Sequence, residues 1–280
     1  MVGRVALALC AAALACITAC SAAPRCSLAA TQVAGPPWLW RVQRPGGPTV
    51  WLFGTLHDSG SADVAPAAWG ALNQAPVFVS ELGGEAPDPR KLADLARQPW
   101  GEVLDRQLAA DDWWDLVTAM QGAMREEELR RARPWFVVMR LISHLARSPR
   151  PSMDDALASA AHERGLRLEA LESWEAQLSA LASTVTPADL TRTIRARAAV
   201  ACEMEALRVA YRGGDEATLR RVLLQQGALL DGRTRAWLPR IERLLADRGA
   251  FVAVGLGHLL GDRGLPALLA QAGYVVERAR

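Results

Sequence analysis

The sequence predicts an α/β fold. Its mixed sheet is built from an N-terminal hairpin, a β–α–β unit and C-terminal strands, with a large helical insertion in the middle. Two observations predict it. Runs of apolar, β-branched and aromatic residues lie near both ends of the chain, at residues 38–55, 76–82 and 250–255. Between about residues 88 and 245 the pattern is helical and is divided by helix start and stop signals.

Local turn chemistry predicts the N-terminal elements. The segment "WLWRVQRPGGPTVWLFGTLH" (38–57) predicts a β-hairpin, because the glycines of "RPGGP" accept the positive φ angles of a turn. "APAAWGALNQ" (65–74) predicts a short helix, and "PVFVSEL" (76–82) predicts a buried strand. A β–α–β crossover of this kind predicts a parallel pair of strands.

Capping residues divide the helical middle. Ser152 with Asp155 predicts a capping box, and Thr186-Pro187 with Asp189 predicts a second helix start. "LRLEALE" (166–172) alternates like a strand within this helical stretch. The chain closes with a strand at "FVAVG", a helix at "GLPALLAQAG" and a last strand at "YVVERAR".

Residues 1–19 predict a signal peptide of the lipoprotein type. Arg4 precedes an apolar run at residues 5–19, which is shorter than the roughly 20 residues of a membrane-spanning helix but typical of an h-region. The run ends in "ITAC", which resembles a lipobox with Cys20 as the lipidation site. The alternative is a plain signal peptide cleaved within "SAAP" or "SLAA". Both alternatives predict export, to the periplasm or to the outer membrane as a lipid-anchored protein.

The remaining chain predicts a tether at residues 20–36 and a single α/β domain at residues 37–280. The 32 basic and 30 acidic residues give a net charge of +2 without a charged block, which argues against a nucleic-acid partner. No polybasic patch is present, so membrane contact is expected only through an N-terminal lipid anchor. The charged run "REEELRRAR" (125–133) predicts a solvated helix face with i,i+4 ion pairs.

A Gly-x-x-His pattern follows two of the predicted strands. It occurs at Gly54 to His57 and again at Gly255 to His258. A glycine near a strand end lets the backbone approach a ligand, and the histidine then lies beyond the carboxyl end of the strand, where open α/β sheets bind ligands. Glu81 ends the predicted strand "VFVSE" in an equivalent position.

Two histidines and one carboxylate predict a divalent-metal site at His57, Glu81 and His258, with positions left for water. The alternative is that each histidine is a hydrogen-bonded loop residue. His144 and His162, by contrast, have the pattern of ordinary helix positions.

Several segments in the same order resemble the TraB/GumN family, whose animal members include the TIKI metalloproteases. These are "WLFGTLH", "VFVSE", "RPSMDDALASAAHERGLRLEALESWEAQLSAL", "AYRGGDEATL" and "AFVAVGLGHLLGDRGLPALLAQAGYVVERAR", and the resemblance covers about residues 37–280. It implies an α/β core with a mixed sheet and metal-dependent hydrolysis carried by His57, Glu81 and His258. Family members commonly carry Arg-Asn shortly before the last helix and strand, whereas this chain has Arg233 followed by Thr234. The resemblance implies that Arg233 acts as an oxyanion or carboxylate clamp.

Three functional hypotheses follow. The first is a metal-dependent hydrolase of peptides or of small esters or amides, in which Glu81 is a metal ligand or the general base and Arg233 polarises the scissile carbonyl. The second is a metal-independent, esterase-like hydrolase in which one histidine is the base and the glutamate orients it. The third is a non-catalytic lipoprotein that binds haem, metal or an envelope polymer.

If Cys20 carries lipid, Cys26 and Cys202 remain as an even pair in an oxidising compartment and predict a disulfide. Labelling of the exported protein with a thiol reagent should then find no free thiol before reduction and two after it. Two free thiols in the untreated protein would contradict the pairing.

Overall fold

The computed structural model describes residues 35–83, 89–146 and 151–279. The predicted signal peptide, the lipidation site Cys20, Cys26 and most of the predicted tether lie outside these residues. Cys202 is disulfide-bonded, and its pairing with Cys26 stays a prediction because Cys26 is not described. Among the described helices, none combines the length and the apolar character that a membrane span requires.

A six-stranded sheet with the order β4-β3-β5-β2-β1-β6 forms the centre of the α/β part. Strand β1 pairs antiparallel with both of its neighbours, whereas the pairs β2–β5, β5–β3 and β3–β4 are parallel. The mixed sheet, the N-terminal hairpin and the C-terminal strands are thus as predicted. The strands are β1 (Leu39–Gln43), β2 (Val50–Thr55), β3 (Val77–Gly83), β4 (Arg167–Ser173), β5 (Ala250–Gly255) and β6 (Val275–Arg278).

Strands β2 and β3 are parallel, but they are not neighbours as the crossover predicted, because β5 lies between them. All six residues of β5 are buried. A strand of this composition is stable only where helices cover both of its faces and strands pair with both of its edges. The last third of the chain therefore supplies the central strand.

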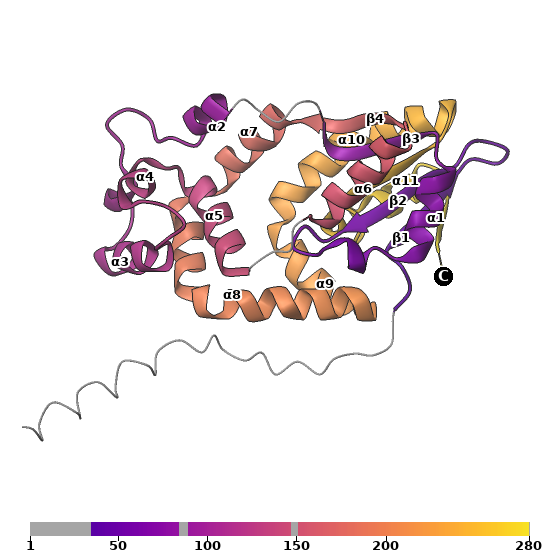
Figure 1. Cartoon of the computed structure of the whole chain (residues 1–280). Helices are drawn as coiled ribbons and strands as arrows, with labels where there is room; N and C mark the ends of the chain where they lie inside the picture. The colour runs from indigo at the N-terminus through magenta and orange to yellow at the C-terminus, as the bar shows by residue number, and fades with distance from the viewer. Residues whose placement is uncertain (1–34, 84–88, 147–150, 280) are drawn as a thin grey trace, which may run out of the picture.

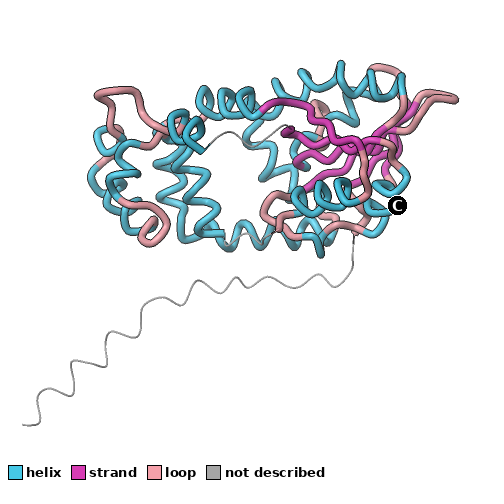
Figure 2. Tube along the Cα trace, turned by 45° about the horizontal axis from the view of Figure 1, so that its top comes forward, coloured by secondary structure: helices cyan, strands magenta, loops and turns pink. Residues whose placement is uncertain are grey.

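Helices cover both faces of the sheet (Figure 2). Helices α1 and α6 lie on one face, and α10 and α11 lie on the other (Figure 1). The capping box predicted at Ser152 and Asp155 opens α6. The bounds are α1 (Pro66–Gln74), α6 (Met153–Glu163), α9 (Glu216–Leu223), α10 (Gly227–Asp247) and α11 (Leu265–Gln271).

Part of the predicted helical insertion forms a separate group at the other end of the molecule, whereas α6, β4 and α10 belong to the layers of the sheet (Figure 1). The helices of this group enclose a second hydrophobic core that includes Leu116, Leu129 and Leu141. Helix α8 contributes Ile194 to this core and Leu207 to the core of the sheet, so one 27-residue helix stabilises both. The helices are α2 (Pro89–Leu95), α3 (Ala110–Ala119), α4 (Glu126–Arg131), α5 (Pro134–Ala146), α7 (Trp174–Thr184) and α8 (Pro187–Gly213).

The C-terminal end of α8 is tied to the first Gly-x-x-His loop. The hydroxyl of Tyr211 donates a 2.6 Å hydrogen bond to the carbonyl of Gly54, and the indole of Trp38 donates a 2.9 Å bond to the carbonyl of Tyr211. Both bonds are buried, so water cannot replace them. They hold the end of β2 against α8.

Replacement of Tyr211 by phenylalanine should therefore lower the free energy of unfolding by about 1 to 3 kcal/mol, because the Gly54 carbonyl loses its buried donor. Urea denaturation of both proteins measures the difference. Tyr274→Phe is the matched control: its hydroxyl accepts from the exposed Arg44, a donor that water can satisfy, so its loss should be smaller. Equal losses in the two variants would contradict the role of Tyr211.

Candidate functional site

The carboxyl ends of four parallel strands meet at one edge of the sheet, and each carries a polar side chain. His57 follows β2, Glu81 lies near the end of β3, Glu172 lies near the end of β4, and His258 ends the short 3-10 helix Leu256–His258 after β5. Because β4, β3, β5 and β2 are consecutive in the sheet, these side chains come from adjacent strands. The edge faces the helical group (Figure 1).

Glu81 is the centre of the site. Its side chain is buried, with the residue 7% exposed. Its Oε2 lies 3.8 Å from Nε2 of His57, and its Oε1 lies 3.1 Å from Nε2 of His258 and 3.7 Å from Nη2 of Arg233. The structure thus brings together the four residues that the sequence analysis selected.

The two motif glycines allow this approach. A Cβ atom on Gly255 would lie 3.1 Å from Nε2 of His57 and 3.7 Å from Oε1 of Glu81. A Cβ atom on Gly54 would lie 2.6 Å from a side-chain carbon of Leu256, closer than such contacts allow. Each glycine therefore makes room for a residue of the other loop or for the site itself.

Asp154, in the first turn of α6, orients His57. Its Oδ2 lies 2.8 Å from Nδ1 of His57, and its Oδ1 accepts a 2.7 Å hydrogen bond from the hydroxyl of Thr55. The Asp154 carboxylate raises the pKa of His57 to about 10, with a smaller contribution from Glu81. The imidazole is 61% exposed, so one ring face remains open to solvent.

Thr234 orients His258. Its hydroxyl donates to the carbonyl of Leu230 at 2.8 Å, so its oxygen accepts from Nδ1 of His258 at 2.7 Å. Nη1 of Arg233 lies 3.3 Å from Nε2 of His258, and a guanidinium can only donate. Both contacts orient the ring so that Nε2 faces Glu81 and Arg233. Burial lowers the pKa of His258.

Arg233 binds a second carboxylate. Its Nε lies 3.0 Å from Oε1 of Glu172, and its Nη2 contacts the same carboxylate. The indole of Trp237 donates to Glu172 at 3.3 Å, and the guanidinium lies 5.1 Å from the ring of Trp237. This packing fixes the guanidinium beside Glu81 and His258.

The pKa of Glu81 falls to about 2. Burial alone would raise it, but His258, His57 and Arg233 together stabilise the anion more strongly. Glu81 is therefore a carboxylate at neutral pH. A carboxylate with so low a pKa accepts protons poorly. Glu81 is therefore better suited to bind a cation than to act as a general base.

The donor chemistry of the site fits a divalent cation. Oε1 of Glu81 is buried without a hydrogen bond from any described residue. It lies 3.1 Å from Nε2 of His258, a contact that is favourable only when a proton or a cation lies between the two atoms. The side chains are nevertheless not gathered around one point: within the part of the chain that is described, no group of three or more His, Cys, Asp or Glu residues forms a metal-binding cluster. His57 and His258 approach different oxygens of Glu81 instead.

Three residues of the site were not selected from the sequence. Glu172 has the same signal as Glu81, a carboxylate near the end of a strand. Asp154 is adjacent to Asp155, which caps the helix, so only one of the two acids has a local role. Thr234 stands where the resemblance led us to expect asparagine, and its oxygen accepts from His258.

The fold and site together define a protein with paired histidine loops and buried carboxylates at the carboxyl edge of a largely parallel sheet. The sequence model of the TraB/PrgY/gumN family matches residues 38–278, and the chain belongs to this family. Neither the curated proteins nor the solved structures include a match.

In the metal-free protein, His57 should contribute to stability in a pH-dependent way. Its pKa is raised from 6.5 to about 10, so its stabilising contribution is complete below pH 6.5 and is lost as the pH rises through 10. Because the ring is exposed, we expect His57→Gln to cost at most about 1 kcal/mol at pH 6 and almost nothing at pH 10.

Urea denaturation at both pH values, with EDTA present, measures this difference. His144→Gln is the control, since this exposed histidine on α5 has no ion pair with a described residue. A His57→Gln effect that is equal at pH 6 and pH 10 would contradict the Asp154–His57 interaction.

Proposed function

We propose that this protein is an exported, lipid-anchored hydrolase in which His57, Glu81 and His258 bind a divalent metal ion. The observation that carries the proposal is the convergence of two imidazole Nε2 atoms on one buried carboxylate at the carboxyl edge of adjacent strands. Substrates of this class are peptides or small esters and amides. The family assignment supports the proposal without naming a reaction.

The residues around the proposed ligands prepare them for a cation. Asp154 and Thr234 each hold the Nδ1 side of a histidine, so both Nε2 atoms are directed toward Glu81. Such contacts to the far side of a ligand fix its orientation and raise its basicity. When bound, the ion supplies positive charge that activates water and polarises a carbonyl group.

Arg233 is the proposed electrophilic residue. Its guanidinium is held by Glu172 and Trp237, and it lies beside both Glu81 and His258. A fixed cation in a partly dehydrated site stabilises negative charge that develops on a carbonyl oxygen, without reorganising during the reaction.

Metal content tests the proposal directly. Elemental analysis of the purified full-length protein should find bound divalent metal, and His57→Ala and His258→Ala should each bind it at least about tenfold more weakly. His144→Ala and His162→Ala are matched controls at exposed helix positions and should bind as the wild type does. Equally low metal in all five proteins would remove the metal from the mechanism.

Asp154→Asn should weaken metal binding by about 10- to 100-fold, because the orienting acceptor loses its charge. Asp155→Asn is the matched control, since the Asp155 carboxylate is bonded to Ser152, the N-cap residue of α6. Titration with a competing chelator measures both affinities. Equal affinities in the two variants would exclude an orienting role of Asp154.

One observation favours a second candidate, a metal-independent hydrolase. The 2.8 Å contact between Asp154 and His57 is also the geometry of an acid–histidine pair that activates water. Because the pKa of His57 is about 10, the base would be available only at alkaline pH, and activity should rise up to that value. Full hydrolysis of an ester or peptide panel in excess chelator would favour this candidate over the first.

A further inference from the structure

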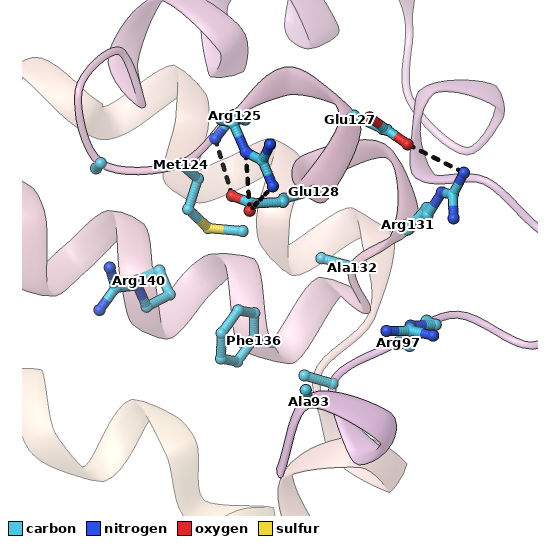
Figure 3. A pocket seen from close by; sticks show the side chains of 12 residues that line it. Ala93, Arg97, Met124, Arg125, Glu127, Glu128, Arg131, Ala132, Phe136 and Arg140 are labelled. Carbon is cyan, nitrogen blue, oxygen red and sulfur yellow. Dashed lines mark hydrogen bonds and ion pairs between the residues drawn. The ribbon is translucent and has the colours of Figure 1, made fainter. Parts of the chain in front are cut away.

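A pocket of about 520 Å³ lies in the helical group and not among the strands that carry the candidate site. Its lining comes from α2, α4, α5 and the segment between α3 and α4 (Figure 3). Its volume is within the range of pockets that hold small organic ligands. None of its residues belongs to the elements that carry His57, Glu81 or His258.

The inner surface of the pocket is apolar and combines two large side chains with several alanines. Phe136 and Met124 lie in its middle (Figure 3). Ala96 and Ala132 are buried beside them, and their short side chains leave the volume open. An apolar body is therefore what this space can desolvate favourably.

The pocket is preformed, because hydrogen bonds join the segments that form its back. The ends of α2 and α4 form an antiparallel bridge between Arg97 and Ala132. The amide of Gln98 donates to the carbonyl of Arg131 at 2.7 Å, and the amide of Arg133 donates to the carbonyl of Ala96 at 2.7 Å. Ligand binding would therefore not require these segments to become ordered.

The rim carries an excess of positive charge. Four arginines and two glutamates line the pocket, and both glutamates are already paired: Glu128 with Arg125, and Glu127 with Arg131. These ion pairs agree with the solvated helix face predicted for residues 125–133.

Arg97 and Arg140 remain, on opposite sides of Phe136 (Figure 3). Neither of them forms an ion pair with a residue that the structure describes.

We propose that this pocket binds a small amphipathic anion, with its apolar body against Phe136 and Met124 and its carboxylate at Arg97 or Arg140. Guanidinium groups form strong, bidentate hydrogen bonds with carboxylates. The excess positive charge excludes amphipathic cations. The assignment is independent of the proposed catalytic site.

Calorimetric titration of the full-length protein with octanoate, 1-octanol and octyltrimethylammonium tests the proposal. Octanoate should bind at least about tenfold more tightly than 1-octanol, and the cation should not bind. Octanoate affinity should also fall as salt is raised, because the arginines are exposed. Equal binding of octanoate and 1-octanol, or no binding of octanoate, overturns the proposal.

Variants identify the site of binding. Arg97→Gln with Arg140→Gln should weaken octanoate binding about tenfold and leave 1-octanol unchanged. Arg106→Gln with Arg221→Gln, two exposed arginines that do not line the pocket, should bind octanoate as the wild type does. Ala93→Trp, at the exposed end of α2, should block both ligands by filling the pocket while the thermal transition stays unchanged. Wild-type octanoate binding by either pocket variant overturns the assignment.

Discussion

The buried carboxylate of Glu81 is the constraint around which the carboxyl edge of the sheet is arranged. An ionised carboxylate at the end of a buried strand is costly to desolvate, and it persists only when positive groups or donors surround it. His57, His258 and Arg233 supply that environment from three other segments of the chain. Each of these groups is in turn held by a further contact, from Asp154, Thr234 and Glu172. The site thus has an inner layer, formed by Glu81 and the groups around it, and an outer layer, formed by Asp154, Thr234 and Glu172. The outer layer fixes the orientation of the groups that face Glu81.

The sequence predicted the inner layer better than the outer layer. His57, Glu81 and His258 share a simple rule, a polar residue just beyond an apolar strand, and parallel strands bring such residues to one edge without further information. Asp154 and Thr234 follow no comparable rule. Each lies within a helix, where neighbouring polar residues have local roles, and only the packing of α6 and α10 on the sheet selects the one that reaches a histidine. Glu172 also lies near the end of a strand, although it was not among the predicted site residues.

The fold shows the same division between local and distant interactions. The hairpin turn and the capping boxes at Ser152 and Thr186 are predictable from a few adjacent residues, and the structure contains each of them. The position of β5 between β2 and β3 was not predictable in this way. It depends on two strand edges, at residues 50–55 and 77–83, that lie far earlier in the chain, and the fully buried β5 pairs with both of them.

That strand order also bears on how the polypeptide acquires its shape during synthesis. Until residues 250–255 have been made, β2 and β3 have no common partner, so the β1–β2 hairpin and the β3–β4 pair cannot be joined into one sheet. Contacts across such long separations form slowly, because the loop between them must be closed first. A chain shortened at its C-terminus would therefore not yield a smaller version of the domain. It would lack the element that joins the two halves of the sheet and would expose their unpaired edges to other copies of itself.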